Sequence, residues 1–112
     1  MTTNHAPYPY SGPVDLQAPI LAALSRVVDP ELAMTIVDVG LVYAVTVTPE
    51  RLHVAITMTS AACPVTDAIL DDVEDELSKA APADMQLDVE LVWEPAWTPE
   101  RLSPRAKAFM GW

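Results

Sequence analysis

The chain has 112 residues, with 16 acidic and 6 basic side chains and a formal net charge of -10. This length supports one hydrophobic core, and the acidic balance argues against generic binding to nucleic acid or to an anionic membrane, which needs clustered Lys and Arg. A single cysteine forms neither an internal disulfide nor, by itself, a zinc site, so Cys63 acts alone or with a second chain.

Residues 1–14 mix proline, tyrosine and small polar residues without a helical or strand period. This composition favours a flexible leader ahead of a single domain at residues 15–112. The chain shows no signal-peptide pattern and no run of about 18 unbroken apolar residues. We therefore expect a cytoplasmic protein that does not enter a membrane.

The first predicted helix begins at Asp15, because Ile20, Leu24 and Val27 form one apolar stripe with Val28. It should end by Val28, since the following residue precedes a proline and is pushed out of the α region.

Three later segments alternate between apolar and polar residues with period two, which is typical of strands with one solvated face. The apolar positions are Leu41, Tyr43, Val45 and Val47 in the first, Leu52, Val54, Ile56 and Met58 in the second, and Leu87, Val89, Leu91 and Trp93 in the third. Pro49 and Glu50 suit a tight turn, so the first two strands should form a hairpin.

A second helix is predicted over residues 66–81, with an apolar stripe at Ile69, Val73 and Leu77 and an acidic opposite face. Its right-handed crossover should leave the third strand parallel to the second. We expect the third strand to lie on the free side of the first. The prediction is an α+β, two-layer α-β-β-α-β domain, with strand order 2-1-3, antiparallel neighbours and both helices on one face.

The tail holds Pro95, Pro99 and Pro104, followed by a short helical run at 104–110. It contains three of the six basic residues, whereas residues 67–94 carry ten acidic side chains against Lys79 alone. The negative charge therefore belongs mainly to the second helix and third strand, which form a candidate docking face beside Cys63.

Cys63 precedes Pro64, and proline favours the first position of a helix. Cys63 would then lie at the N-cap of the second helix, where backbone N–H groups and the helix dipole stabilise a thiolate. The negative charges of Asp67 and Asp71 would instead disfavour the thiolate and raise the pKa of Cys63. An inert, buried cysteine is an equally weighted interpretation.

Three other features have both a structural and a functional interpretation. Asp29, Glu31 and Asp38 place carboxylates around an irregular loop, where turn formation is favoured over a metal or polar site. Gly40 opens the first strand, where a positive φ or a close neighbour is often found. Trp93 and Trp97 flank Pro95 and are favoured as a structural lid over a partner surface. His53 and His5 are expected to be solvated.

Four segments occur together in order and spacing: Asp29-Pro30-Glu31, residues 36–43, residues 58–64, and residues 93–97. Together they resemble the SufT/PaaD-like family of metal-sulfur cluster assembly factors, within the iron-sulfur cluster assembly domain superfamily. The resemblance covers about residues 16–109. Ala96 stands where the family's tryptophan motif has a second proline, and no cysteine-bearing segment of the PaaD kind follows Trp97, so the SufT-like branch is favoured.

The resemblance implies a protein without catalytic turnover that helps to assemble iron-sulfur clusters or to transfer them to client apoproteins. Cys63 would be a transient ligand of a shared iron-sulfur cluster, completed by a client, by glutathione or by the second chain of a homodimer. The implied partners are client apoproteins and the cluster assembly machinery. The supporting motif residues are Asp29, Pro30, Glu31, Asp38, Gly40, Tyr43, Thr59, Pro64, Trp93, Pro95 and Trp97.

Three alternatives stay open. One is a pathway-specific, PaaD-like factor for oxygenase maturation. Another is a thiol enzyme, such as a peroxidase or reductase, which would need a group to activate Cys63 and a resolving cysteine. The last is a KH-like RNA-binding module, against which the acidic second helix and the absence of a GxxG loop both count.

Overall fold

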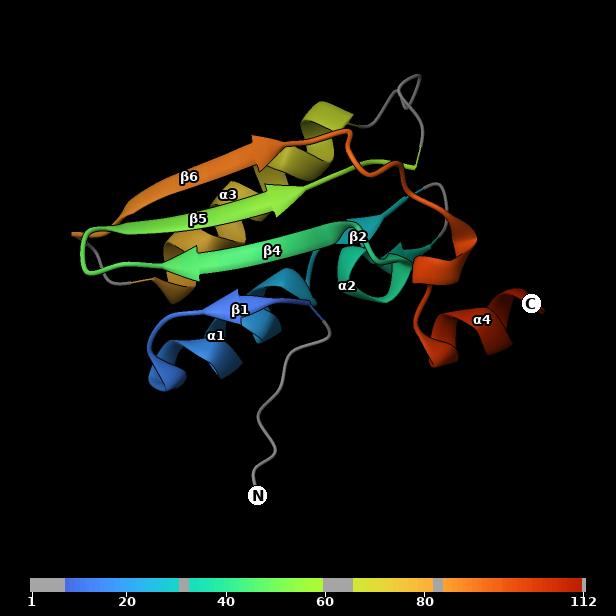
Figure 1. The fold of residues 1–112 in the computed structure, drawn as a ribbon, viewed down its shortest axis with the longest axis horizontal. Helices are drawn as coiled ribbons and strands as arrows, with labels where there is room; N and C mark the ends of the chain where they lie inside the picture. The colour runs from blue at the N-terminus through green and yellow to red at the C-terminus, as the bar shows by residue number, and fades with distance from the viewer. Residues whose placement is uncertain (1–7, 31–32, 60–65, 82–83, 112) are drawn as a thin grey trace.

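The computed structural model describes residues 8–30, 33–59, 66–81 and 84–111 (Figure 1). Within these ranges a mixed sheet and a small hairpin combine with α-helices and one 3-10 helix, η1. In chain order the elements are β1 (Tyr10–Ser11), α1 (Val14–Leu24), β2 (Val28–Asp29), β3 (Met34–Thr35), α2 (Ile36–Val39), β4 (Val42–Val47), β5 (Arg51–Ile56), α3 (Thr66–Ala80), β6 (Gln86–Leu91), η1 (Pro99–Arg101) and α4 (Pro104–Met110). The predicted α+β class is confirmed.

Helices α1 and α3 pack against each other and lie behind the same face of the main sheet in Figure 1. Their buried side chains, Ile20 and Leu24 from α1 and Ile69, Val73 and Leu77 from α3, meet the inward residues of the strands. α3 spans almost the whole predicted range, because its stripe of apolar residues recurs every three to four positions.

The strand order is β1-β4-β5-β6, so the predicted order 2-1-3 is wrong. The antiparallel hairpin of β4 and β5 and the parallel direction of β6 are both confirmed. However, β6 pairs with β5 itself and not with β4. The crossover through α3 returns the chain to the nearest free edge, which makes a right-handed β-α-β unit of adjacent parallel strands.

The other edge of β4 pairs with β1, a strand that the side-chain pattern does not predict. Tyr10 lies opposite Val45, and the Val45 N–H donates a 2.9 Å hydrogen bond to the Pro9 carbonyl oxygen. Tyr8 is buried with only 6% of its surface exposed. The division of the chain into a leader at 1–14 and one domain stays a prediction, and residues 1–7 lie outside the described ranges.

Helix α1 ends at Leu24, four residues before the predicted limit at Val28. Val28 belongs instead to β2, which pairs with β3 as a small antiparallel hairpin. The Val27 carbonyl oxygen accepts a 2.9 Å hydrogen bond from the Ile36 N–H. The apolar character of Val27 and Val28 therefore reflects a hairpin beside α2 and not a further helical turn.

The register of β4 against β5 shifts between Val42 and Ala44. Val42 and Val45 are both buried, so two residues separate successive inward positions, as in a β-bulge. The predicted placement of Tyr43 on the core face is therefore wrong: the bulge turns its side chain out of the core, where it is half-buried.

Candidate functional site

The predicted motifs converge at one edge of the main sheet, which we call the site edge and define by residues 40–42, 57–59 and 92–93. Because β5 and β6 are parallel, both carboxyl ends lie there, and the antiparallel β4 begins there. Two backbone hydrogen bonds of 2.8 Å continue the sheet into this edge, from Thr57 N–H to the Leu41 carbonyl and from Val92 N–H to the Ile56 carbonyl. Figure 1 shows β2, α2 and α4 at this same end of the sheet.

The short helix α2 supplies Asp38 and Gly40 to the site edge. Thr35 caps its start, since the Thr35 hydroxyl accepts a 3.1 Å hydrogen bond from the Asp38 N–H. Gly40 ends the helix with a φ of 83°, a left-handed conformation that favours glycine. A Cβ at Gly40 would overlap the backbone carbonyl of Arg101. The expectation of a positive φ or a close neighbour is therefore confirmed on both counts.

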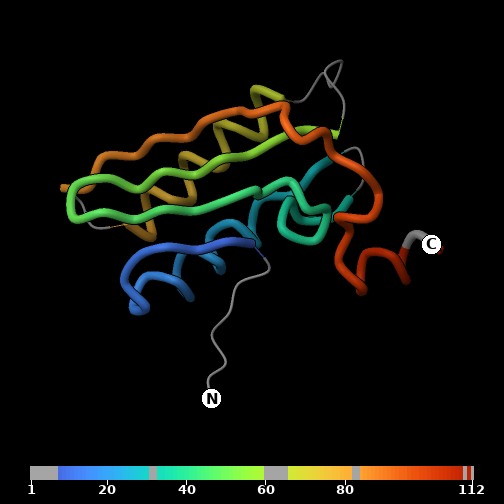
Figure 2. The backbone as a smooth tube through the Cα atoms, viewed as in Figure 1, coloured from blue at the N-terminus to red at the C-terminus, as the bar shows by residue number. Residues whose placement is uncertain are grey.

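The segment that follows β6 crosses α2 and is fastened to it by four hydrogen bonds. The Trp97 indole N–H donates to the Val39 carbonyl oxygen at 2.7 Å, and Arg101 Nε donates to the Gly40 carbonyl oxygen at 3.0 Å. Ser103 donates twice to Asp38, from its N–H to the backbone carbonyl at 2.8 Å and from its hydroxyl to the carboxylate at 2.9 Å. In Figure 2 this orange segment runs beside the start of β4.

Tyr43 adds a further contact between the two distant motifs. Its hydroxyl donates a 2.5 Å hydrogen bond to the Pro95 carbonyl oxygen, and the Arg101 guanidinium lies 4.0 Å from the centre of its ring. Sequence reasoning placed Tyr43 and Pro95 in the site but assigned no role to Arg101. The only sequence signal for Arg101 is its membership of the basic C-terminal segment.

Asp29 is buried, with 1% of its surface exposed, at the end of β2. The Ala33 N–H donates a 2.8 Å hydrogen bond to the Asp29 backbone carbonyl, and Ala33 has a φ of 57°. The interpretation of the acidic-proline motif as a turn held by Asp29 and Asp38 stays a prediction. Glu31 lies outside the described residues.

Of the loop residues, Thr59 is half-buried at the site edge, whereas Cys63 and Pro64 lie outside the described residues. The predicted N-cap position of Cys63 therefore stays a prediction. The two tryptophans differ in environment: Trp97 is half-buried and hydrogen-bonded, and Trp93 is 42% exposed. Trp97 therefore makes a structural contact with α2, and Trp93 is partly exposed just past the end of β6. The lid role of the two tryptophans stays a prediction.

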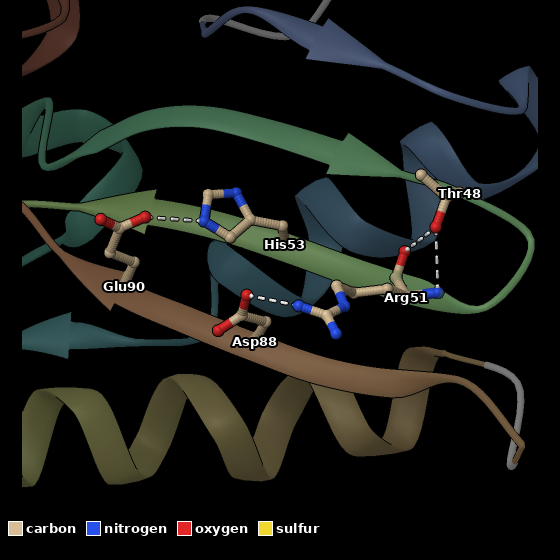
Figure 3. Close-up of polar contacts among 5 residues, drawn as sticks. All are labelled: Thr48, Arg51, His53, Asp88 and Glu90. Atoms are coloured by element: carbon tan, nitrogen blue, oxygen red, sulfur yellow. Dashed lines mark hydrogen bonds and ion pairs between the residues drawn. The ribbon is translucent and has the colours of Figure 1, made fainter.

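His53 lies on the sheet face opposite the helices, as expected, but it is paired and not simply solvated. Its Nε2 lies 2.9 Å from a Glu90 carboxylate oxygen, and Arg51 lies 3.2 Å from the Asp88 carboxylate (Figure 3). Figure 3 shows both pairs bridging β5 and β6. These are cross-strand pairs that stabilise the sheet. Within the described part of the chain, no three His, Cys, Asp or Glu side chains gather as they would to hold a metal ion.

No helix within the described residues is long and apolar enough to cross a bilayer.

The family described as "Iron-sulfur cluster assembly protein" matches residues 17–90. The "Fe-S protein maturation auxiliary factor YitW" of Bacillus subtilis is 40% identical over 97 residues, which cover 86% of this chain and 94% of that protein. The "Fe-S protein maturation auxiliary factor SufT" of Staphylococcus aureus is 41% identical over 86 residues, 76% of this chain and 97% of that protein.

A relative named for a different role is an Escherichia coli protein described as one of the subunits of a 1,2-phenylacetyl-CoA epoxidase. It is 32% identical over 89 residues, which cover 79% of this chain and 53% of that protein. Among solved structures, the "Domain of Unknown Function DUF59" from Bacillus anthracis has a TM-score of 0.80 and 39% sequence identity, covering 87% of this chain and 92% of that chain.

Proposed function

The chain belongs to the iron-sulfur cluster assembly protein family, as a SufT/YitW-like member and a relative of the PaaD-type proteins. On this premise we propose that it is an auxiliary factor in the maturation of iron-sulfur proteins. We propose further that Cys63 is a transient ligand of a cluster that passes to client apoproteins. The single observation that carries this proposal is the convergence of the motif residues at the site edge.

The contacts at the site edge support a rigid platform beside the chain segment that carries Cys63. Trp97 donates a hydrogen bond to the Val39 carbonyl, at the end of α2. Arg101 donates one to the carbonyl of the next residue, Gly40, before β4 begins. Such bonds fix the backbone at the edge, because each carbonyl that would otherwise face water has a defined donor. A site held by rigid elements presents a reactive loop with reproducible geometry.

Cys63 follows Thr59, at the site edge, and precedes Thr66, the first residue of α3, in the sequence. We propose that its thiol acts beside the surface that presents Trp93, which is 42% exposed.

The chemistry of the donor set fits transfer better than storage. Iron in a cluster is bound by thiolate sulfur, and one thiolate per chain leaves the other positions to a client, a second chain or a small thiol. In the transfer step a client thiol loses its proton and forms an iron–sulfur bond while the Cys63–iron bond breaks and Cys63 regains a proton. No electrons move, so the step requires no oxidant or reductant.

Anaerobic reconstitution with iron and sulfide tests the ligand role directly. We expect the wild-type protein to develop the charge-transfer absorbance of a cluster and Cys63→Ser to retain little of it. The matched control is Ser60→Ala, which changes the same segment without touching the thiol and should behave like wild type. Equal iron and sulfide content in wild type and Cys63→Ser would exclude Cys63 as a ligand.

A second candidate is service to one oxygenase pathway, which the relationship to the Escherichia coli epoxidase protein favours. The two candidates differ in client range. A general factor should transfer its cluster at similar rates to an apo-ferredoxin and to an apo-reductase of an oxygenase, whereas a dedicated factor should serve only the second. We infer that the protein acts stoichiometrically in this exchange and has no turnover of its own.

A further inference from the structure

We propose that the hollow between α4 and the β2–β3 hairpin, the α4 groove, docks an acidic segment of a partner protein that carries one large apolar side chain beside its carboxylates. The groove encloses about 270 Å³. Its apolar lining comes from Val28, Ala33, Met34, Ala106 and Phe109, and its cation is Arg105.

The lining leaves apolar surface exposed to water. The described residues include four exposed large hydrophobic side chains, and two of them line this groove, Phe109 at 71% and Val28 at 46%. Beneath them α4 is anchored, because Leu102 and Ala106 are buried and the Ser103 hydroxyl caps the helix by accepting the Ala106 N–H at 3.0 Å. A firm, exposed apolar patch of this kind marks an interaction site.

The groove lies at the basic end of an otherwise acidic chain, and its charged lining residues are Arg105 and Asp38. Residues 1–100 hold all 16 acidic and three basic side chains, a net of -13, whereas residues 101–112 hold three basic and no acidic ones, a net of +3, and the two sum to -10. A partner segment that fits the groove and its surroundings therefore brings carboxylates.

Arg105 is available to such a carboxylate. Arg26, Arg51 and Lys79 each form an ion pair, and Arg101 contacts Gly40 and Tyr43, whereas Arg105 and Lys107 have no ion pair among the described residues. The polar lining residues Thr35 and Asp38 already bond each other, and Asp38 also bonds Ser103.

The position of Arg105 is unfavourable for the helix that carries it. Arg105 lies in the first turn of α4, which contains no acidic residue, and a positive charge near a helix N-terminus opposes the helix dipole. Helix stability therefore does not account for a cation here. Residues that break a local rule in this way concentrate at functional surfaces.

A short acidic segment fits these observations better than a polyanion does. RNA or an anionic membrane would bring many negative charges against the -13 of the remaining chain, which repels them over the range of a Debye length. A short segment with one apolar anchor brings only a few negative charges, and docking in the groove places them near Arg105 and away from the acidic remainder of the chain.

The probe for the test is a fluorescein-labelled octapeptide, Gly-Asp-Glu-Ala-Phe-Asp-Glu-Gly, titrated into the full chain. We expect amide NMR shifts at Val28, Met34 and Ala106, and a Kd that Arg105→Glu weakens by at least about tenfold. The helix dipole favours Glu at this position, so lost binding is not explained by lost helix. Phe109→Ser should weaken binding similarly.

The matched control is Lys107→Glu, which makes the same charge change on the same helix but lines a different hollow with Thr98 and Pro99. It should change Kd by less than about threefold. Equal weakening by both variants, or no shifts up to about 1 mM peptide, would overturn the proposal. So would tighter binding of the same peptide with Lys in place of each Asp and Glu, of phosphatidylserine vesicles or of a 12-nucleotide RNA. Binding should persist in Cys63→Ser, so this test is independent of the cluster-ligand role.

Discussion

The indole N–H of Trp97 donates a 2.7 Å hydrogen bond to the backbone carbonyl of Val39, across 58 positions of sequence. Trp97→Phe keeps most of the ring's packing and leaves this carbonyl without its donor. We expect the free energy of unfolding to fall by about 1–2 kcal/mol, as measured by urea denaturation. Trp93→Phe, at a 42% exposed position, should cost less than about 0.5 kcal/mol. Equal costs would show that the Val39 bond contributes nothing.

Gly40→Ala should destabilise the packing of the C-terminal segment against α2 and lower the free energy of unfolding. The new Cβ would overlap the Arg101 carbonyl and lie 2.8 Å from the Arg101 Cβ, at a backbone φ of 83°. Strain and overlap together should cost about 3 kcal/mol. Gly111→Ala is a close control, because its φ is 79° and, among the described residues other than its chain neighbours, no atom lies within 4 Å of the position that a Cβ would take. Only the strain of about 1 kcal/mol should remain there, and a Gly40→Ala cost no larger than this would contradict the predicted overlap.

Burial of Tyr8 should make the free energy of unfolding fall at alkaline pH. Burial, followed by the influence of Tyr10, raises the pKa of Tyr8 to about 12. A tyrosine in the unfolded chain has a pKa near 10, so the folded state binds this proton more tightly. The stabilisation is complete below about pH 10 and falls by about 1.4 kcal/mol per pH unit as the pH rises toward 12.

The variant Tyr8→Phe removes the titrating group from this position and should flatten that decline. Denaturant midpoints of wild type and Tyr8→Phe, measured from pH 8 to pH 11.5, supply the comparison. Parallel curves for the two proteins over this range would show that Tyr8 ionises as easily in the folded state as in the unfolded one.

Thr57→Val should stabilise the site edge. Thr57 is completely buried, and its hydroxyl has no hydrogen-bond partner among the residues that the structure describes. Replacing an unpartnered buried hydroxyl by a methyl group of similar volume removes a desolvation cost, so we expect a gain of about 1 kcal/mol in thermal or urea denaturation. Thr46→Val, at an exposed position in β4, is the control and should be nearly neutral. A loss of stability in Thr57→Val would reveal a partner for this hydroxyl.

Helices α1 and α3 and the β4–β5 hairpin were predictable because their side chains recur with a regular period, whereas the short helix α2 and the β2–β3 hairpin were not predicted. α3 follows from the spacing of Ile69, Val73 and Leu77, and the Pro49–Glu50 turn of the hairpin follows from turn chemistry. The place of β6 was not predictable from periodicity, because a parallel strand shows the same alternation beside either neighbour. β1 left no signal at all, since two residues bound through their backbone need no side-chain pattern.

The candidate site likewise contains residues that could be predicted from the sequence and residues that could not. Gly40 and Trp97 stand out in the sequence, the first by its conformational freedom and the second by its motif. Arg101 and Ser103 do not, because their contacts are made to the Gly40 carbonyl and to Asp38 across more than sixty positions. A donor that bonds a distant backbone carbonyl imposes no spacing that is recognisable in a sequence.

The strand order also determines how copies of this chain can meet. Within the described sheet β6 is an outer strand, and its solvent-facing side chains include Asp88 and Glu90. Two antiparallel copies joined along β6 would bring these carboxylates together, a repulsion that natural proteins use to prevent continuous sheets between molecules. At the opposite edge, β1 spans two of the described residues and pairs with Val45 and Thr46 of β4. The charged side chains of β6 therefore disfavour continuous sheets through that edge, and we expect a homodimer to form through side-chain surfaces.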